Sequence, residues 1–147
     1  MPIIDRGPHI KTILVVDDME AVLHLVAGIL RKANFSVLTA SGGAEAVALA
    51  GKHKGTIDLL LTDIEMPDIS GFDLGIAFKE SRPHIHIMLM SGQKSGDLLV
   101  LNYGWNCIRK PFIPTQLVEM VRSVLKSPDK SQGSHRFDNR ADEKAPA

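Results

Sequence analysis

The chain has 147 residues, of which 44% are hydrophobic and 23% are charged, and its formal net charge is zero. This length and composition are typical of one folded domain with its own hydrophobic core. The charge balance and the lack of an apolar run of roughly 18 residues argue against direct contact with nucleic acid or a membrane. Cys107 is the only cysteine. It cannot form an internal disulfide, and we expect a cytoplasmic protein.

The first elements predicted along the chain are two strands separated by a helix. Residues 13–16 form a β-branched apolar run, which is typical of a strand covered on both faces. Residues 35–40 predict a second strand. Between them, a helix ending near Asn34 is indicated by apolar residues at helical spacing, namely Val22, Leu25, Val26, Ile29 and Leu30.

The middle of the chain repeats this alternation. An alanine-rich helix is predicted to begin at Gly43. The residues expected on one face of this helix are Ala44, Val47 and Ala48. Residues 59–62 then predict a third strand, closed by Asp63, and residues 72–80 predict a third helix.

The last elements are less evenly marked. Residues 85–90 predict a fourth strand, and residues 107–108 predict a brief fifth one. In the segment 92–103, where Gly96 interrupts the pattern, we expect only a short helix. A final helix is indicated by an apolar stripe of Leu117, Met120, Val121, Val124 and Leu125.

Five strands that alternate with helices, without hairpin signals, predict an α/β fold with a doubly wound parallel sheet and helices on both faces. We expect this domain to span residues 11–126, after an N-terminal extension over residues 1–10. Residues 127–147 are rich in Ser, Pro, Gly and charged residues. They have too few apolar side chains to offset chain entropy, so we expect a disordered polar tail.

Polar residues follow the predicted strands at their carboxyl ends. They are Asp17, Asp18, Asp63, Ser91 and Lys110. In a parallel sheet these ends meet at one edge, which is also where ligands bind. Three carboxylates in one crevice repel one another unless a cation lies between them, and an all-oxygen ligand set favours Mg²⁺ over zinc.

An aspartate beside such an ion can attack a phosphoryl group, provided that the charge on the phosphoryl oxygens is neutralised. A lysine ammonium and a hydroxyl, as in Lys110 and Ser91, are suited to that task. Taken singly, Asp17 or Asp18 is more typical of a helix cap, Lys110 of a solvated surface and Ser91 of a turn. Only their joint pattern indicates a site.

Four segments resemble the response-regulator receiver family in order and spacing. They are ILVVDD at 13–18, LLLTDIEMP at 59–67 with Gly71, MLMSG at 88–92 and KPF at 110–112. The resemblance covers roughly residues 11–126 and implies a five-stranded flavodoxin-like sheet in the order 2-1-3-4-5. It also implies Mg²⁺ as the cofactor, with ligands from Asp17, Asp18, Asp63 and the backbone carbonyl of Glu65.

By the same resemblance, Asp63 is the phosphoacceptor, Ser91 the switch hydroxyl and Lys110 the phosphate-binding lysine. Family members usually have a cis peptide at the position that matches the bond between Lys110 and Pro111. The chain departs from the family at Cys107, where an aromatic residue that moves with the switch hydroxyl is common.

Two further departures lie between the switch serine and the lysine. The segment from Ser91 to Lys110 is a few residues shorter than in many receivers, and Trp105 follows Gly104 where alanine is common. One hypothesis is that Trp105 or Tyr103 replaces the missing aromatic residue of the switch.

The resemblance implies a single-domain response regulator that accepts a phosphoryl group from a sensor histidine kinase or a phosphotransfer protein and signals through a downstream protein. Such a chain catalyses its own phosphorylation and is not expected to turn over a small substrate. Three alternatives stay open: a receiver-fold module that binds partners without phosphorylation, a receiver excised from a hybrid kinase, and a small-molecule phosphatase or phosphotransferase. The last is disfavoured because Glu65 makes a poor D-x-D pattern with Asp63.

Overall fold

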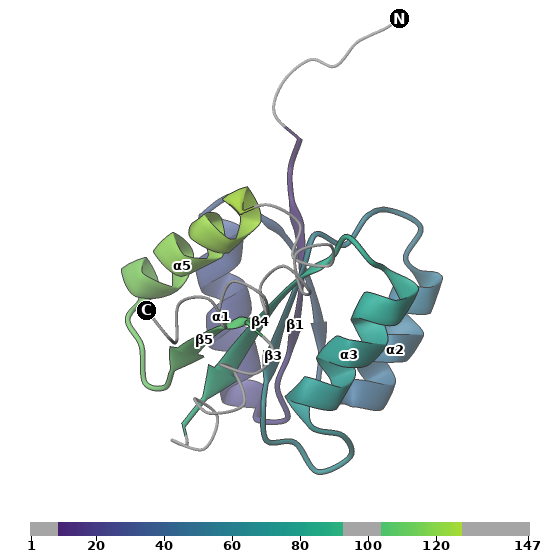
Figure 1. Ribbon diagram of the computed structural model, residues 1–147. Helices are drawn as coiled ribbons and strands as arrows, with labels where there is room; N and C mark the ends of the chain where they lie inside the picture. Colours follow the sequence, from purple (N-terminus) through teal and green to yellow (C-terminus); the bar gives the residue numbers. More distant parts are fainter. Residues whose placement is uncertain (1–8, 93–103, 128–147) are drawn as a thin grey trace, which may run out of the picture.

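The computed structural model describes residues 9–92 and 104–127, which form a five-stranded parallel sheet in the order β2-β1-β3-β4-β5. The strands are β1 (Thr12–Val16), β2 (Ser36–Ala40), β3 (Leu59–Asp63), β4 (His86–Ser91) and β5 (Asn106–Arg109). The helices are α1 (Glu20–Lys32), α2 (Gly43–Lys52), α3 (Gly71–Ser81) and α5 (Pro114–Lys126). Helices α1 and α5 cover one face of the sheet and α2 and α3 the other (Figure 1). The predicted doubly wound fold is confirmed.

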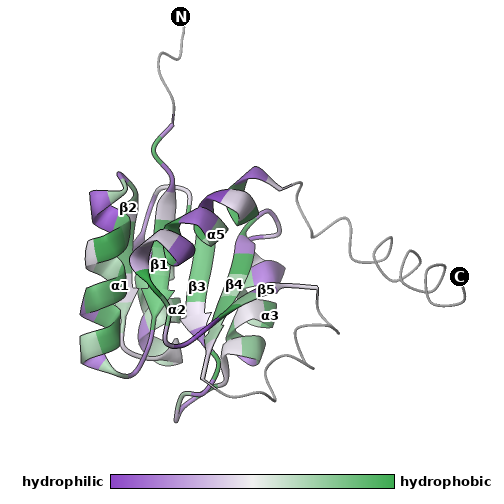
Figure 2. Cartoon of the chain, turned by 90° about the vertical axis from the view of Figure 1, so that its left-hand side faces the viewer, coloured by the Kyte–Doolittle hydropathy of each residue, from purple (hydrophilic) through white to green (hydrophobic). Residues whose placement is uncertain are grey.

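The three inner strands β1, β3 and β4 are apolar because this part of the sheet is buried on both faces. All five residues of β1 are buried, with Ile13 and Val15 in the core under α1 and α5, and Leu14 and Val16 in the core under α2 and α3. Figure 2 shows that the inner strands β1, β3 and β4 are mostly hydrophobic and lie between the helices. Among the described residues, no helix has the length and apolar character needed to cross a membrane.

Two predicted helix faces need correction. In α1, Leu25 is exposed, whereas Leu23 and Ala27 are buried. Leu25 lies about 100° around the helix from Val26, on the side away from Ala27. The apolar stripe is therefore rotated toward Leu23, and Leu25 reaches solvent.

In α2, the predicted face is the solvent face. The three residues predicted on the buried face, Ala44, Val47 and Ala48, are exposed, whereas Gly43, Ala46 and Ala50 are buried. Alanine is a weak indicator of the buried face because it occurs on either side of a helix. The short helix expected within 92–103 lies outside the described residues, as does nearly all of the predicted extension (1–10) and tail (127–147).

Trp105 is a packing residue beneath α3. It is only 9% exposed and lies just before β5 in the core shared with α2 and α3. The strand register places it level with Ile87, four residues before Ser91, which is roughly 13 Å along a strand. This position does not favour the hypothesis that Trp105 replaces the switch aromatic, and Tyr103 lies outside the described residues.

Gly75 of α3 makes room for the Trp105 ring. A Cβ atom added at Gly75 would lie 2.8 Å from two carbon atoms of that ring. We expect Gly75→Ala to lower the free energy of unfolding by about 1–3 kcal/mol, because overpacking outweighs the better helix propensity of alanine. Urea unfolding followed by circular dichroism measures this change.

Gly28 of α1 provides the matched control, since a Cβ atom there meets nothing within 4 Å. Gly28→Ala should raise the free energy of unfolding by about 0.5–1 kcal/mol. In a Trp105→Phe background, the cost of Gly75→Ala should shrink because the smaller ring leaves space. An equal cost in both backgrounds would contradict this account of the packing.

Candidate functional site

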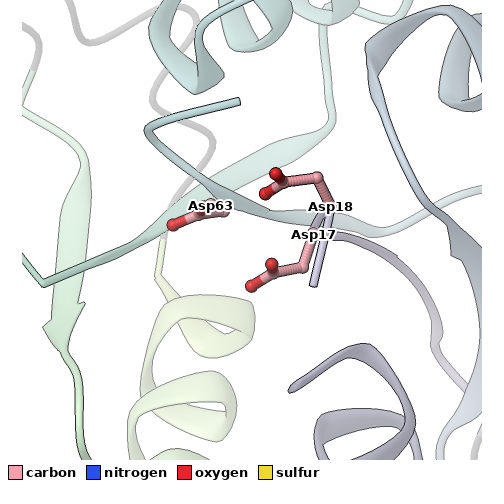
Figure 3. A group of neighbouring side chains, drawn as sticks. All are labelled: Asp17, Asp18 and Asp63. Carbon is pink, nitrogen blue, oxygen red and sulfur yellow. The ribbon is translucent and has the colours of Figure 1, made fainter. Parts of the chain in front are cut away.

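The carboxyl ends of β1 and β3 bring three aspartates together. Val16 pairs with Thr62 in the register of these neighbouring strands, so Asp17 and Asp63 lie at the same level of the sheet. Asp17 is fully buried, Asp63 is nearly so, and Asp18 is exposed. One carboxylate oxygen of each residue lies within 4.8 Å of those of the other two, and Figure 3 shows the side chains grouped beyond the strand ends. The predicted acidic cluster is therefore present.

Lys110, which follows the edge strand β5, forms hydrogen bonds with two of these carboxylates. Its Nζ atom donates to Oδ2 of Asp17 at 3.0 Å and to Oδ1 of Asp63 at 3.1 Å. Its backbone N–H donates to the carbonyl of Ser91 at 2.8 Å, which joins the ends of β5 and β4. The peptide bond between Lys110 and Pro111 is cis, as predicted from the family resemblance.

Asp17 is held in place by three hydrogen bonds. Its Oδ1 accepts a hydrogen bond from the backbone N–H of Met19 at 2.9 Å, while its Oδ2 accepts from Lys110. Its own N–H donates to the carbonyl of Ala40 at 3.2 Å. Asp17 thus anchors the cluster, and exposed Asp18 opens it toward solvent.

Ser91 and Glu65 occupy the same edge of the sheet. Ser91 is the last residue of β4 and is buried, and the N–H of Ile64 donates to the carbonyl of Met90 at 3.0 Å, keeping the ends of β3 and β4 together. Glu65 is exposed in the loop that follows β3. The roles assigned to the Ser91 hydroxyl and the Glu65 carbonyl remain predictions.

The charged side chains of the site shift one another's pKa values. Burial raises the pKa of the Asp63 carboxyl above its ordinary value; the charge of Lys110 acts against this rise, and the charges of Asp17 and Asp18 add to it. Burial alone would lower the pKa of Lys110. Its hydrogen bond to Asp17 and the charges of Asp63 and Asp17 outweigh burial, so the pKa of Lys110 lies above its ordinary value.

The donor set fits a magnesium ion. Three carboxylates and one ammonium leave an excess of two negative charges. All the available ligands are oxygen atoms, and the open side next to Asp18 leaves space for waters, which Mg²⁺ retains in proteins. Asp17, Asp18 and Asp63 are therefore suited to hold this ion.

Two residues that support Asp63 were not assigned a role from sequence. The buried Thr62 hydroxyl donates to the Asp63 carbonyl at 2.9 Å. Gly71 packs on the same carbonyl so closely that an added Cβ atom would lie 2.3 Å from its oxygen. In the sequence, Gly71 appears only as part of the resembling segment, and Thr62 only as the last residue of the predicted third strand; neither carries a local signal for contact with the Asp63 carbonyl.

A family model described as the response regulator receiver domain matches residues 13–122. The chain belongs to this receiver family. The receiver is 27% identical to the alkaline phosphatase synthesis transcriptional regulatory protein PhoP of Bacillus subtilis over 132 residues, which cover 88% of this chain and 54% of PhoP. It thus spans about half the length of curated relatives that it matches.

Solved receiver structures agree in fold. A CheY-like receiver domain protein from Methanospirillum hungatei is 29% identical, with a TM-score of 0.70 and coverage of 84% of this chain and 98% of that one. The response regulator TrrA from Thermotoga maritima, solved in complex with Mg²⁺ and BeF, is 28% identical, with a TM-score of 0.70 and coverage of 78% and 99%. Receiver domains bind Mg²⁺ at an acidic pocket of this kind.

From the raised pKa of Asp63 we predict how the free energy of unfolding depends on this residue in metal-free buffer. Because the folded state binds the Asp63 proton more tightly than the unfolded state does, ionised Asp63 destabilises the fold above its folded pKa. Asp63→Asn should therefore unfold at higher urea concentration than the native chain at pH 7 with a chelator. This advantage should shrink as the pH falls through the folded pKa of Asp63.

Magnesium provides the control for this experiment. Saturating Mg²⁺ should stabilise the native chain more than Asp63→Asn, because an ion that binds only the folded state adds to its stability. A variant that is less stable than the native chain in chelator at pH 7 would contradict the assigned cost of burying Asp63.

Proposed function

We propose that this receiver accepts a phosphoryl group on Asp63 from a sensor histidine kinase or a phosphotransfer protein, in a reaction that requires Mg²⁺. The observation that carries the proposal is the bridge from Lys110 to Asp17 and Asp63 inside a three-carboxylate cluster. This arrangement combines a nucleophile, an anion-binding ammonium and cation ligands at one strand edge. Those are the parts that phosphoryl transfer to a carboxylate needs.

A magnesium ion would be held by Asp17, Asp18, Asp63 and the Glu65 carbonyl, and it supplies positive charge to the carboxylates and the phosphoryl oxygens. A carboxylate oxygen of Asp63 forms the bond to phosphorus as the phosphorus–nitrogen bond of a phosphohistidine breaks. The electron pair of that bond stays with the donor imidazole, which takes up a proton. Asp63 thus enters the reaction ionised, a form that Lys110 favours.

Lys110 and Ser91 neutralise the transferred group in this proposal. The Lys110 ammonium already contacts an Asp63 oxygen, so a short movement lets it donate to a phosphoryl oxygen instead. The Ser91 hydroxyl, at the end of the strand next to β3, donates to another. Movement of these two side chains links phosphorylation to the surface around β4 and β5.

The signal is read by a protein partner without an aromatic switch at position 107. Cys107 is half-buried, level with Leu89 of β4, and packs against the core shared with α2 and α3. A thiol is too small to sweep between a buried and an exposed position as an aromatic ring does. We propose that this signalling takes place in the cytoplasm, whose reducing conditions keep the thiol of Cys107, the one cysteine of the sequence, reduced.

Mass spectrometry after incubation with acetyl phosphate and Mg²⁺ tests the proposal. We expect one phosphoryl group on the native chain, none without Mg²⁺ and none on Asp63→Asn. Asp73→Asn is the control, because Asp73 is an exposed aspartate in the first turn of α3 and should leave the adduct unchanged. An unmodified native chain would instead favour an interaction module that works without phosphorylation.

Lys110→Ala separates the role of the ammonium from that of the metal ligands. Phosphorylation should slow by about a hundredfold, the size of effect expected when one donor to a developing oxyanion is lost. Mg²⁺ should bind at least as tightly as in the native chain, because two carboxylates lose a competing cation. Calorimetric titration with Mg²⁺ measures the second effect, and weaker binding would show that Lys110 assembles the metal site.

A further inference from the structure

The loop after β3 is fastened to the start of α2 by Asp68. One carboxylate oxygen, Oδ1, accepts hydrogen bonds from the backbone N–H groups of Gly43 at 3.3 Å and Ile69 at 2.9 Å. The other, Oδ2, accepts from Ala44 at 3.0 Å. The residue before the helix, Gly42, has no side chain to cap these groups. Asp68, 25 residues away from Gly43, therefore acts as the cap of α2.

A second contact, independent of charge, holds the same loop. A Cβ atom on Gly43 would lie 1.9 Å from Cγ2 of Ile69, so the Ile69 side chain occupies the space that a side chain at position 43 would fill. Helices α2 and α3 lie on the same face of the sheet, with this loop leading into α3 (Figure 1). Hydrogen bonds of Asp68 and apolar contacts of Ile69 thus hold this part of the loop at the start of α2.

The other end of the loop is fixed to β3 and α3. The N–H of Gly71 donates to the carbonyl of Ile64 at 2.8 Å, and the Ser70 hydroxyl accepts from the N–H of Asp73 at 3.1 Å. Gly71 also packs directly on the Asp63 carbonyl. Between these anchors lies Glu65, two residues after the phosphoacceptor. The position of the Glu65 backbone therefore depends on the contacts that residues 68–71 make with α2, α3 and β3.

We propose that Asp68 is a positioning residue for the phosphoacceptor site: by capping α2 from the loop after β3, it holds the backbone that presents the Glu65 carbonyl to the metal ion. This proposal rests on the proposed function, because it assumes that Mg²⁺ binds beside Asp63. The hydrogen bonds from Ala44 and Gly43 also hold the pKa of Asp68 below its ordinary value, so the capping carboxylate stays ionised at neutral pH.

The test compares three variants by Mg²⁺ calorimetry and by the rate of phosphorylation with acetyl phosphate. Asp68→Ala should weaken Mg²⁺ binding about tenfold, at the low end of what loss of outer-shell support costs a metal site, and should slow phosphorylation at subsaturating Mg²⁺. Asp68→Asn keeps an acceptor oxygen and should recover most of both. Amide hydrogen exchange of residues 64–70 should be faster in Asp68→Ala than in the native chain.

Glu45→Ala is the matched control for the stability of α2. Glu45 accepts hydrogen bonds from the N–H of Ser41 at 2.8 Å and from its hydroxyl at 2.7 Å, so it also supports the start of α2, through a residue that is not part of the loop after β3. It should leave Mg²⁺ affinity and loop exchange unchanged. An equal loss of affinity in Glu45→Ala would overturn the positioning role, because helix stability alone would then explain the effect.

The outcomes also separate this inference from the proposed function. A native chain that binds no Mg²⁺ overturns both. A native chain that binds Mg²⁺ and is phosphorylated, together with an Asp68→Ala variant of equal affinity and equal loop exchange, overturns only the role of Asp68.

Discussion

The contact of one lysine with two carboxylates organises this protein's functional edge. Lys110 places its ammonium between Asp17 and Asp63, yet the cluster still carries an excess of negative charge. Burying that charge is unfavourable, and the raised pKa of Asp63 expresses the cost. The excess negative charge suits a centre that binds a cation.

The sheet order explains why a lysine is needed. Strand β5 is separated from β3 by β4, and from β1 by β4 and β3, so the span from β5 to β1 is about 14 Å at ordinary strand spacing. The side chains of Lys110 and Asp17, together with the 3.0 Å hydrogen bond between them, cross this span. A side chain shorter than lysine at position 110 would not reach Asp17. The bond from the Lys110 N–H to the Ser91 carbonyl fixes where the lysine side chain starts. The order of the strands, their register and the length of the lysine side chain together place the Lys110 ammonium between Asp17 and Asp63.

The strands and the grouping of the three aspartates at their carboxyl ends could be predicted from sequence because both leave local signals. Continuous apolar runs indicate strands that are buried on both faces. An acidic residue directly after such a run lies at the carboxyl end of the strand, and this holds however the helices pack. The face of α2 could not be predicted, because Ala44 and Ala46 have the same side chain and only the packed fold distinguishes them. The capping of α2 by Asp68 could not be predicted either, because Gly42 has no side chain that signals a cap and Asp68 lies 25 residues after Gly43 in the sequence.

A crystal structure of the native chain with Mg²⁺ and beryllium fluoride tests the central claim most directly, because beryllium fluoride imitates a phosphoryl group on a carboxylate. The account predicts one beryllium fluoride bonded to an Asp63 oxygen, an ion held by the aspartate cluster, and a Lys110 ammonium that has moved from Asp63 to a fluorine atom. A structure in which Lys110 still bridges Asp17 and Asp63, with neither group bound beside them at saturating concentrations, would contradict it.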